Sequence, residues 1–265
     1  MDTHLLGALR KPSSLDGVEP QEVRRDTIRI AAFQRRPLFD DVAGTAIRLK
    51  EDIAWCEDQG VQIAIFPECF LQGYSTDRQA IARRAMHVDG MPFRKLITTL
   101  SPFSTDVILG FIEQRAGGFY NSAAVIRSGE VAGVYAKNRP NEREFLPGAD
   151  APVFRKSGHS YGINICFDAN FPESAKRLSD QGASLICYPL NNMLHPATAD
   201  KWRDKSIENL RSRALETGCW VASSDVVGTH ENKLSHGCTC IVSPDGDIVA
   251  RVAEGEEGIV VCDIG

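Results

Sequence analysis

The sequence predicts an α/β protein in which two β-sheets pack together and helices cover their outer faces. Two segments repeat the order strand, helix, strand, one over residues 27–66 and one over residues 161–188. Short strands separated by glycine-containing turns lie between them, over residues 107–155. Strand–helix–strand units favour parallel pairing, whereas short strands joined by tight turns favour hairpins. Two α/β halves joined through extra hairpins therefore predict two packed sheets.

The first unit begins with the apolar strand Thr27–Phe33. Over residues 41–58, apolar side chains recur three or four positions apart, which is helical spacing. These positions are Val42, Ala46, Leu49 and Ile53. The apolar run 61–66 is a buried strand that stops at Pro67, since proline cannot donate to a β-ladder. The unit predicts a parallel strand pair.

Hairpins follow in the middle of the chain. The strands expected there are Val107–Glu113, Tyr120–Arg127, Val131–Tyr135 and Val153–Arg155. Ser128-Gly129 and Ser157-Gly158 are turn signals between consecutive strands.

The second unit and the C-terminal region complete the expected elements. The strands are Tyr161–Phe167, Ser184–Tyr188 and Trp220–Ser224, and the helices are Pro172–Gln181 and Ala199–Thr217. Hairpin-like strands at Cys238–Val242, Ile248–Val252 and Gly258–Cys262 end the chain.

A single large domain over residues 27–265 is the simplest organisation, with residues 1–26 as an N-terminal extension. The chain has 265 residues and is 43% hydrophobic, which is enough to bury a sizeable core. Residues 1–26 are mixed in composition and include Pro12 and Pro20. No linker divides the remainder.

Composition excludes several functional classes. The formal net charge is −5 and no block of lysine and arginine occurs, so we expect no nucleic-acid partner. No apolar run approaches the roughly 20 residues that span a bilayer, so we expect no membrane association. Eight irregularly spaced cysteines predict reduced thiols in a cytoplasmic protein. The six histidines form no ligand-like cluster, so no metal is expected.

Cys166 is the first candidate for chemistry. It falls near the end of the expected strand Tyr161–Phe167, before the polar and turn-forming residues Asp168, Asn170 and Pro172. The C-terminal edge of a parallel sheet is where α/β proteins bind ligands, and the expected helix at Pro172 would help to lower the thiol pKa. A small buried core residue is the alternative interpretation of a single cysteine.

Glu68 and Lys137 also follow expected strands. Glu68 comes directly after the buried run 61–66, where it is a general base with a raised pKa, a solvated loop acid or a helix cap. Lys137 follows Val131–Tyr135, where it is an ordinary surface lysine or a fixed ammonium that stabilises an oxyanion. Spacing alone does not show that these residues converge.

A serine hydrolase is a competing hypothesis. Gly158-His159-Ser160-Tyr161-Gly162 matches the G-x-S-x-G pattern, and Asp225 and His236 follow in the chain order of a serine triad. The nucleophile elbow must, however, join a strand to the helix after it. Here the motif precedes a strand and joins it to the strand at 153–155, which favours an ordinary hairpin turn.

The chain resembles the nitrilase superfamily of carbon–nitrogen hydrolases. The resemblance covers most of residues 27–263 and rests on short motifs that occur together in the family's order. They are Ile28–Gln34, Phe66-Pro67-Glu68, Tyr135-Ala136-Lys137, Gly162–Asp168 continuing to Phe171-Pro172-Glu173, Arg213–Glu216 and Ser243–Gly246.

The resemblance implies a four-layer α-β-β-α sandwich, a homodimer or larger homo-oligomer, and a catalytic set of Glu68, Lys137 and Cys166. It implies a second glutamate before Pro147-Gly148, for which we choose Glu142 over Glu144, to orient Lys137 or the substrate. The Cys166 thiolate would attack a carbonyl carbon, Lys137 and the Phe167 backbone N–H would hold the oxyanion, and Glu68 would relay protons. Water is the second substrate, and neither a metal nor an organic cofactor is required.

The residues after Cys166 bear on the substrate. Nitrile-cutting members tend to carry Trp-Glu there, whereas this chain has Phe167-Asp168, which favours small amides or N-carbamoyl compounds. Some carbamoyl amino acid hydrolases place an arginine four residues after the nucleophile to clamp a carboxylate. Asn170 stands there instead. Asn191 and its neighbours line the pocket or form a polar loop.

Four hypotheses therefore remain open. The first is an amidase or carbamoylase that releases ammonia through a cysteine thioester, and the second is a nitrilase. The third is a serine hydrolase that uses Ser160, and the fourth is a non-catalytic binding protein. The complete set of Glu68, Lys137 and Cys166 argues against the fourth.

Overall fold

Two six-stranded sheets form the centre of the structure, a computed structural model that describes residues 27–265. The expected extension at residues 1–26 lies outside the described residues. The first sheet has the strand order β14-β1-β2-β3-β4-β5, and the second has the order β13-β12-β9-β8-β7-β6. A two-stranded ribbon, β10-β11, stands apart from both sheets.

The elements of the first half include two helices that cover the first sheet. They are β1 (Ile28–Gln34), α1 (Val42–Asp58), β2 (Ile63–Ile65), α2 (Arg78–Arg84), α3 (Met91–Thr98), β3 (Asp106–Arg115), β4 (Gly118–Arg127) and β5 (Glu130–Ala136).

The elements of the second half include a short 3-10 helix, η1, between a strand and a helix. They are β6 (Val153–Lys156), β7 (His159–Ile163), η1 (Cys166–Asn170), α4 (Pro172–Ser179), β8 (Leu185–Pro189), α5 (Pro196–Thr217), β9 (Trp220–Ser224), β10 (Gly228–His230), β11 (Lys233–Ser235), β12 (Cys240–Val242), β13 (Ile248–Arg251) and β14 (Gly258–Ile264).

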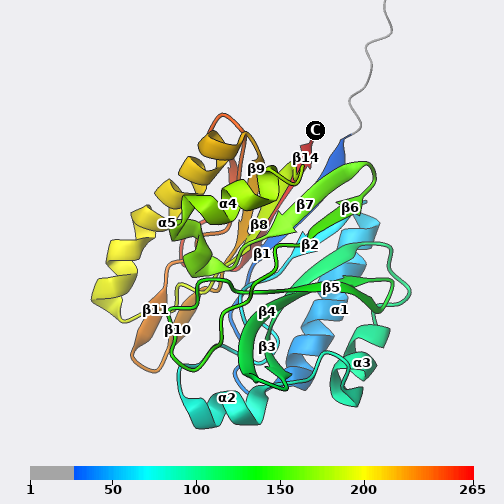
Figure 1. Ribbon diagram of the computed structural model, residues 1–265, viewed down its shortest axis with the longest axis vertical. Helices are drawn as coiled ribbons and strands as arrows, with labels where there is room; N and C mark the ends of the chain where they lie inside the picture. Colours follow the sequence, from blue (N-terminus) through cyan, green and yellow to red (C-terminus); the bar gives the residue numbers. More distant parts are fainter. Residues whose placement is uncertain (1–26) are drawn as a thin grey trace, which may run out of the picture.

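Side-chain alternation along the strands produces the layers. On β1, Ile28 and Ile30 face the second sheet, whereas Ala31 and Phe33 face α1 and α3. Successive residues of a strand point to opposite faces, so each sheet can bury both faces at once. On the second sheet, a further apolar cluster joins β8, β9 and β12 to α4 and α5. In Figure 1, α4 and α5 lie to the upper left and α1 and α3 to the right, with the sheets between them.

The two halves share a plan. In the first sheet β1, β2 and β3 are parallel neighbours, and β4, β5 and β14 add antiparallel edges. In the second sheet β7, β8 and β9 are the parallel neighbours, and β6, β12 and β13 add antiparallel edges. The C-terminal ends of both parallel sets therefore supply positions for ligand-binding side chains.

The predicted two-sheet sandwich with outer helices is confirmed, and so are the two strand–helix–strand units. Helices α2 and α3 and the β10-β11 ribbon were not expected from the sequence. The expected strand Tyr161–Phe167 is wrong in its extent, because β7 ends at Ile163 and the chain turns into η1. The last strand, β14, pairs with β1 of the first sheet, so it is no continuation of the hairpin formed by β12 and β13.

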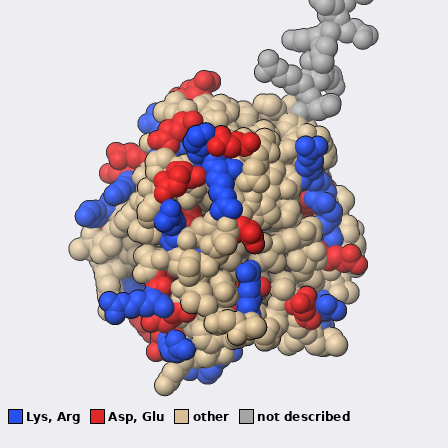
Figure 2. All heavy atoms as spheres, viewed as in Figure 1, with Lys and Arg blue, Asp and Glu red and all other residues tan. Residues whose placement is uncertain are grey.

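Within residues 27–265, every helix is too short or too polar to cross a membrane. On the face shown in Figure 2, basic and acidic side chains are interspersed over α4 and α5. The charge of this face is therefore mixed.

Candidate active site

Glu68 lies in a tight turn directly after β2. Its side chain is only 1% exposed, and its backbone N–H donates to the Leu190 carbonyl at the end of β8, 3.1 Å away. The adjacent strand β3 passes so close that a Cβ at Gly110 would lie 2.2 Å from the Pro67 carbonyl oxygen. Glycine at position 110 thus allows the turn to carry Glu68 into the interior between the sheets.

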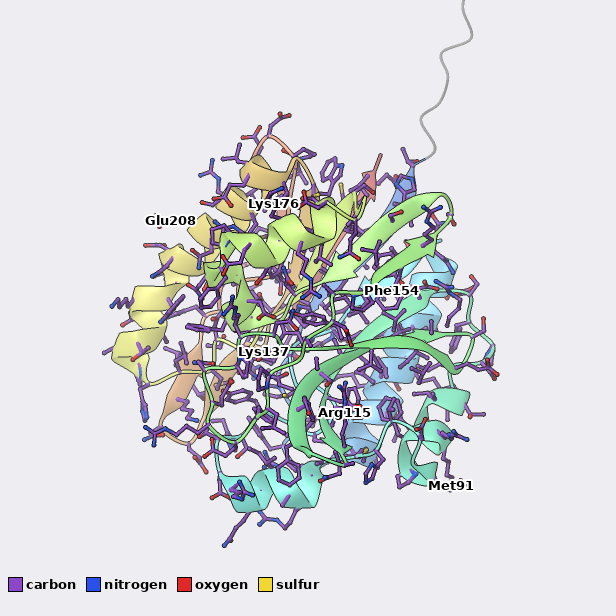
Figure 3. The ribbon with its side chains drawn as sticks, viewed as in Figure 1. Met91, Arg115, Lys137, Phe154, Lys176 and Glu208 are labelled. Atoms are coloured by element: carbon purple, nitrogen blue, oxygen red, sulfur yellow. The ribbon has the colours of Figure 1, made fainter. Side chains whose placement is uncertain are left out.

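Lys137 follows β5 and binds two buried carboxylates. Its Nζ atom lies 2.8 Å from Glu68 Oε1 and 3.2 Å from Glu142 Oε1, and the lysine is 1% exposed. Asn121 on β4 donates to Glu68 Oε1 at 2.6 Å, and the Tyr74 hydroxyl donates to Glu142 Oε1 at 2.5 Å. Each carboxylate therefore has one charged and one neutral donor, which offsets the cost of burying it. In Figure 3, Lys137 lies near the centre of the view.

Cys166 opens η1 in an unusual backbone conformation. Its φ is +42°, in the left-handed region that a side chain with a Cβ rarely adopts. The Cys166 side chain is partly exposed to a pocket, and the backbone N–H of Asn191 hydrogen-bonds to it. The left-handed turn, rather than a strand end, therefore sets the direction of this thiol.

Asp168 ties the cysteine turn to the lysine segment. Its carboxylate accepts from the Tyr135 hydroxyl at 2.7 Å, the Ile165 backbone N–H at 2.9 Å and the Arg139 backbone N–H at 2.8 Å. Tyr135 belongs to β5 and Arg139 follows Lys137, whereas Ile165 precedes Cys166. Asp168 thus holds together two segments from different sheets.

One pocket of about 190 Å³ brings together every residue that the sequence analysis selected for the site. Glu68, Lys137, Cys166, Glu142, Phe167, Asn170 and Asn191 all line it. Glu144, the alternative to Glu142, does not line it.

Burial and neighbouring charges set the protonation of this cluster. Burial raises the pKa of the Glu68 carboxyl, and Lys137 opposes that shift without cancelling it. Burial alone would lower the pKa of Lys137, but Glu68, Cys166 and Glu142 together hold that pKa well above its ordinary value. The ammonium is therefore fixed, and Glu68 is a carboxyl group whose pKa lies above its ordinary value, as suits a general base.

The expectation of a lowered thiol pKa at Cys166 is wrong. Burial raises the pKa of the thiol well above its ordinary value and Glu68 raises it further, while Lys137 and the Asn191 N–H oppose the rise. Cys166 is therefore a thiol at neutral pH and needs a base to become a nucleophile.

Several residues of the pocket and of its hydrogen-bond network were not selected from the sequence. Asn121 is a buried polar residue of β4, 1% exposed, but Ser122 beside it is equally polar and buried, so the sequence does not distinguish Asn121. Tyr74 lies in a loop with no distinguishing pattern. The pocket-lining side of α5, which includes Trp202 and Asn209, also gave no signal, because many surface helices carry such residues.

The structure does not assemble the serine triad. Ser160 lies within β7 opposite Arg155, and its carbonyl accepts from the backbone of Ser184. His236 instead binds Asp200 at 2.8 Å, and Asp225 accepts from Asn192. Gly158 belongs to the turn between β6 and β7, as the hairpin interpretation predicted.

A metal centre has no evident place among residues 27–265. Within them, no three side chains of histidine, cysteine, aspartate or glutamate are grouped so that they could hold a metal ion. The pocket itself presents one thiol, two carboxylates and one ammonium.

Comparison with known proteins identifies the family. The family model of the carbon-nitrogen hydrolases matches residues 29–265, which is nearly all of the described chain. The chain belongs to the carbon-nitrogen hydrolase family. This confirms the resemblance to the nitrilase superfamily, and the family supports hydrolysis of a carbon–nitrogen bond as the reaction.

The relatives of this carbon-nitrogen hydrolase cover most of its length. It is 30% identical over 89% of its length to the hydrolase in the pqqF 5' region of Pseudomonas protegens, of which 82% is covered. It is 27% identical to a nitrilase of Pyrococcus abyssi, with 89% of each chain covered. The crystal structure of an amidase from Nesterenkonia sp. superposes with a TM-score of 0.78 at 24% identity, over 92% of each chain. This likeness confirms the fold.

Proposed function

We propose that the protein hydrolyses the carbon–nitrogen bond of a small amide or N-carbamoyl compound and releases ammonia through a thioester on Cys166. One observation carries the proposal: Lys137 Nζ lies 2.8 Å from Glu68 Oε1 in the pocket that Cys166 also lines. A nucleophile, a base and a fixed cation are the groups that acyl transfer requires.

The first half-reaction forms the thioester. Glu68 takes the proton of the Cys166 thiol as the sulfur attacks the carbonyl carbon. Lys137 and the backbone N–H of Phe167 stabilise the oxyanion. The carbon–nitrogen bond then breaks, Glu68 passes its proton to the leaving nitrogen, and ammonia departs.

The second half-reaction consumes water. Glu68 takes a proton from a water molecule as its oxygen attacks the thioester carbonyl. The carbon–sulfur bond breaks, the sulfur recovers the proton, and the acid leaves. Glu142 orients Lys137 throughout, since its Oε1 atom lies 3.2 Å from Nζ.

Ammonia release from small amides, ureido compounds and nitriles tests the proposal. We expect Cys166→Ala to lower kcat/KM by at least about 10⁴-fold, because no other group on this pathway can form the thioester. Cys262→Ser is the matched control, since Cys262 is a partly exposed thiol on β14 that does not line the pocket. Turnover retained in Cys166→Ala would refute the thioester. Turnover of nitriles alone would favour the nitrilase alternative.

Assembly and location complete the proposal. We expect a homodimer or larger homo-oligomer, which the exposed apolar side chains of Leu215 and Val249 support, being 60% and 47% exposed. Light scattering on the purified protein tests this, and a monomer at micromolar concentration would contradict it. A cytoplasmic location is supported by the eight free cysteines.

A further inference from the structure

One side of helix α5 forms a wall of the pocket. The residues that line it recur at helical spacing and therefore share one face of the helix. They are Thr198, Trp202, Ser206, Asn209 and Leu210. None of these five side chains carries a charge at neutral pH.

The other faces of α5 are strongly charged. Their ionisable residues are Asp200, Lys201, Arg203, Asp204, Lys205, Glu208, Arg211, Arg213 and Glu216. None of these nine lines the pocket. Arg203, for example, pairs with Glu254, and Arg211 donates to the Gly246 carbonyl. Figure 3 shows Glu208 on the outer side of the helix. Charge is thus abundant on α5 and kept off the face that a substrate would touch.

The residues of η1 after Cys166 that line the pocket, Phe167, Ala169 and Asn170, are also neutral, and the side chain of Asn170 is already engaged. Asn170 Nδ2 donates to the Phe167 carbonyl at 3.1 Å, and Asn170 Oδ1 accepts from Asn209 Nδ2 at 3.0 Å. The remaining wall carries the apolar side chains of Leu190 and Leu194 and the neutral amides of Asn141, Asn191 and Asn192. The ionisable side chains that line the pocket, apart from Cys166 and Tyr74, are Glu68, Lys137 and Glu142, which bind one another.

We infer that the part of the substrate beyond the reacting amide is uncharged, an inference that rests on the proposed amide hydrolysis. A carboxylate or ammonium on this part would lose its hydration without gaining an ion-pair partner. An aliphatic or amide-bearing group would instead pack on Trp202 and Leu194 and meet neutral hydrogen-bonding groups. The substrate class is therefore neutral primary amides or neutral ureido compounds, rather than N-carbamoyl amino acids.

A neighbouring hollow does not supply a cationic side chain that would bind a substrate carboxylate. It shares Tyr74 and Asn191 with the pocket and contains three cationic side chains, Arg83, Arg84 and Lys233. Three acidic side chains, Asp40, Asp77 and Glu231, line the same hollow. Asp40 binds Arg84 at 2.5 Å. The formal charges balance, so this hollow has no net preference for an anionic tail.

The test compares three amides of matched length: pentanamide, 4-carbamoylbutanoate, which ends in a carboxylate, and 5-aminopentanamide, which ends in an ammonium. Ammonia release gives kcat/KM for each with the full-length protein. We expect pentanamide to exceed both charged amides by about 100-fold or more, since neither charge finds a partner. Equal or faster turnover of a charged amide overturns the inference and leaves amide hydrolysis intact. If the protein turns over none of the three amides and no other neutral amide, the result overturns both this inference and the proposed amide hydrolysis.

Two substitutions on the α5 face sharpen this test. Asn209→Arg and Thr198→Lys each add a cation to the neutral wall, and Thr198 is exposed at the start of the helix, where it tolerates a longer side chain. We expect at least one to raise the ratio of kcat/KM for 4-carbamoylbutanoate to that for pentanamide by about tenfold. Asn209→Gln, which adds no charge, leaves that ratio within about twofold. An unchanged ratio in both cationic variants, with pentanamide turnover retained, contradicts the inference.

Discussion

The two sheets contribute different kinds of group to the pocket. The first sheet supplies its ions, because Glu68 follows β2, Lys137 follows β5 and Glu142 lies in the loop beyond. The second sheet supplies the thiol of Cys166 and otherwise neutral walls, including one face of α5. The ions of the site are thus encoded in the first half of the chain, and the thiol and the neutral walls are encoded in the second. Substitutions in the two halves should have different effects.

Among substitutions of the three ions, removing the charge of Glu68 should have the largest effect on activity. Glu68→Gln keeps the shape of the side chain and removes the base, so we expect kcat/KM for an amide to fall by about 10³-fold or more. Glu173→Gln is the matched control, because Glu173 ends the second Phe-Pro-Glu tripeptide but is exposed and paired with Arg139. Ammonia release measures both variants. Equal losses in the two would show that Glu68 is not the base.

Removing Lys137 should cost stability as well as activity. Lys137→Gln leaves two buried carboxylates without their cation, so we expect the free energy of unfolding to fall by about 3–5 kcal/mol at pH 8. The folded-state pKa of Glu68, already raised by burial, would rise further. An acid whose folded pKa is raised loses stability as pH rises above its unfolded pKa, so the deficit should be smaller near pH 5.

Urea unfolding at pH 5 and pH 8 measures that deficit. Lys176→Gln is the control, since Lys176 forms an exposed pair with Asp180 on α4 and should change stability by less than about 1 kcal/mol. A Lys137→Gln deficit that is the same at both pH values would argue against two buried carboxylates that depend on this lysine.

The pH dependence of kcat/KM should report the ionisation of Glu68. Burial raises the pKa of this carboxyl above its ordinary value of 4.5, so activity should rise with pH through a limb centred above 4.5. Lys137 should cause no alkaline loss below its ordinary pKa of 10.5, because its carboxylate partners hold its pKa higher. Ammonia release between pH 4 and pH 10 traces the profile. A limb at or below 4.5 would contradict the buried environment of Glu68.

Removing a hydrogen bond between the two halves of the chain should have the smallest of these effects. Tyr135→Phe removes the 2.7 Å hydrogen bond to Asp168, so we expect about 1–2 kcal/mol of lost stability and a several-fold fall in kcat. Tyr161→Phe is a close match, since Tyr161 donates to the buried Asp106 at 2.8 Å and does not line the pocket. It should lose similar stability with no change in kcat. If Tyr135→Phe and Tyr161→Phe had the same kcat, the hydrogen bond from Tyr135 to Asp168 would not be needed to position Cys166.

The fold and the ions could be predicted because local patterns encode them. The strand–helix–strand units appear in the hydrophobic periodicity of the sequence. Glu68 and Lys137 each follow an apolar strand, and a charged residue directly after a buried strand is a candidate for a functional role. Cys166 lines the pocket with the other selected residues, but its left-handed backbone was not foreseen, because it is a residue other than glycine at a positive φ. A local hydrogen bond from the Ile165 backbone N–H to Asp168 and a tertiary one from the Asn191 backbone N–H to Cys166 hold that turn, and the second leaves no trace in the local sequence.

The neutral wall was largely out of reach of sequence reasoning. Its members come from η1, the loop after β8, and α5, which are distant in sequence. Asn170 indicated that no arginine stands at that position to bind a substrate carboxylate. Its hydrogen bond to Asn209, however, forms only where α5 packs against η1. The periodicity of α5 identifies a helix and not which of its polar residues will face a cavity.

The most direct test of the central claim is to identify the covalent intermediate. A rapid acid quench of the protein during amide turnover, followed by intact-mass analysis and peptide mapping, should show one added acyl group on Cys166. The same adduct should form in Cys262→Ser and be absent from Cys166→Ala. An adduct on another residue, or full turnover by Cys166→Ala, would contradict the account.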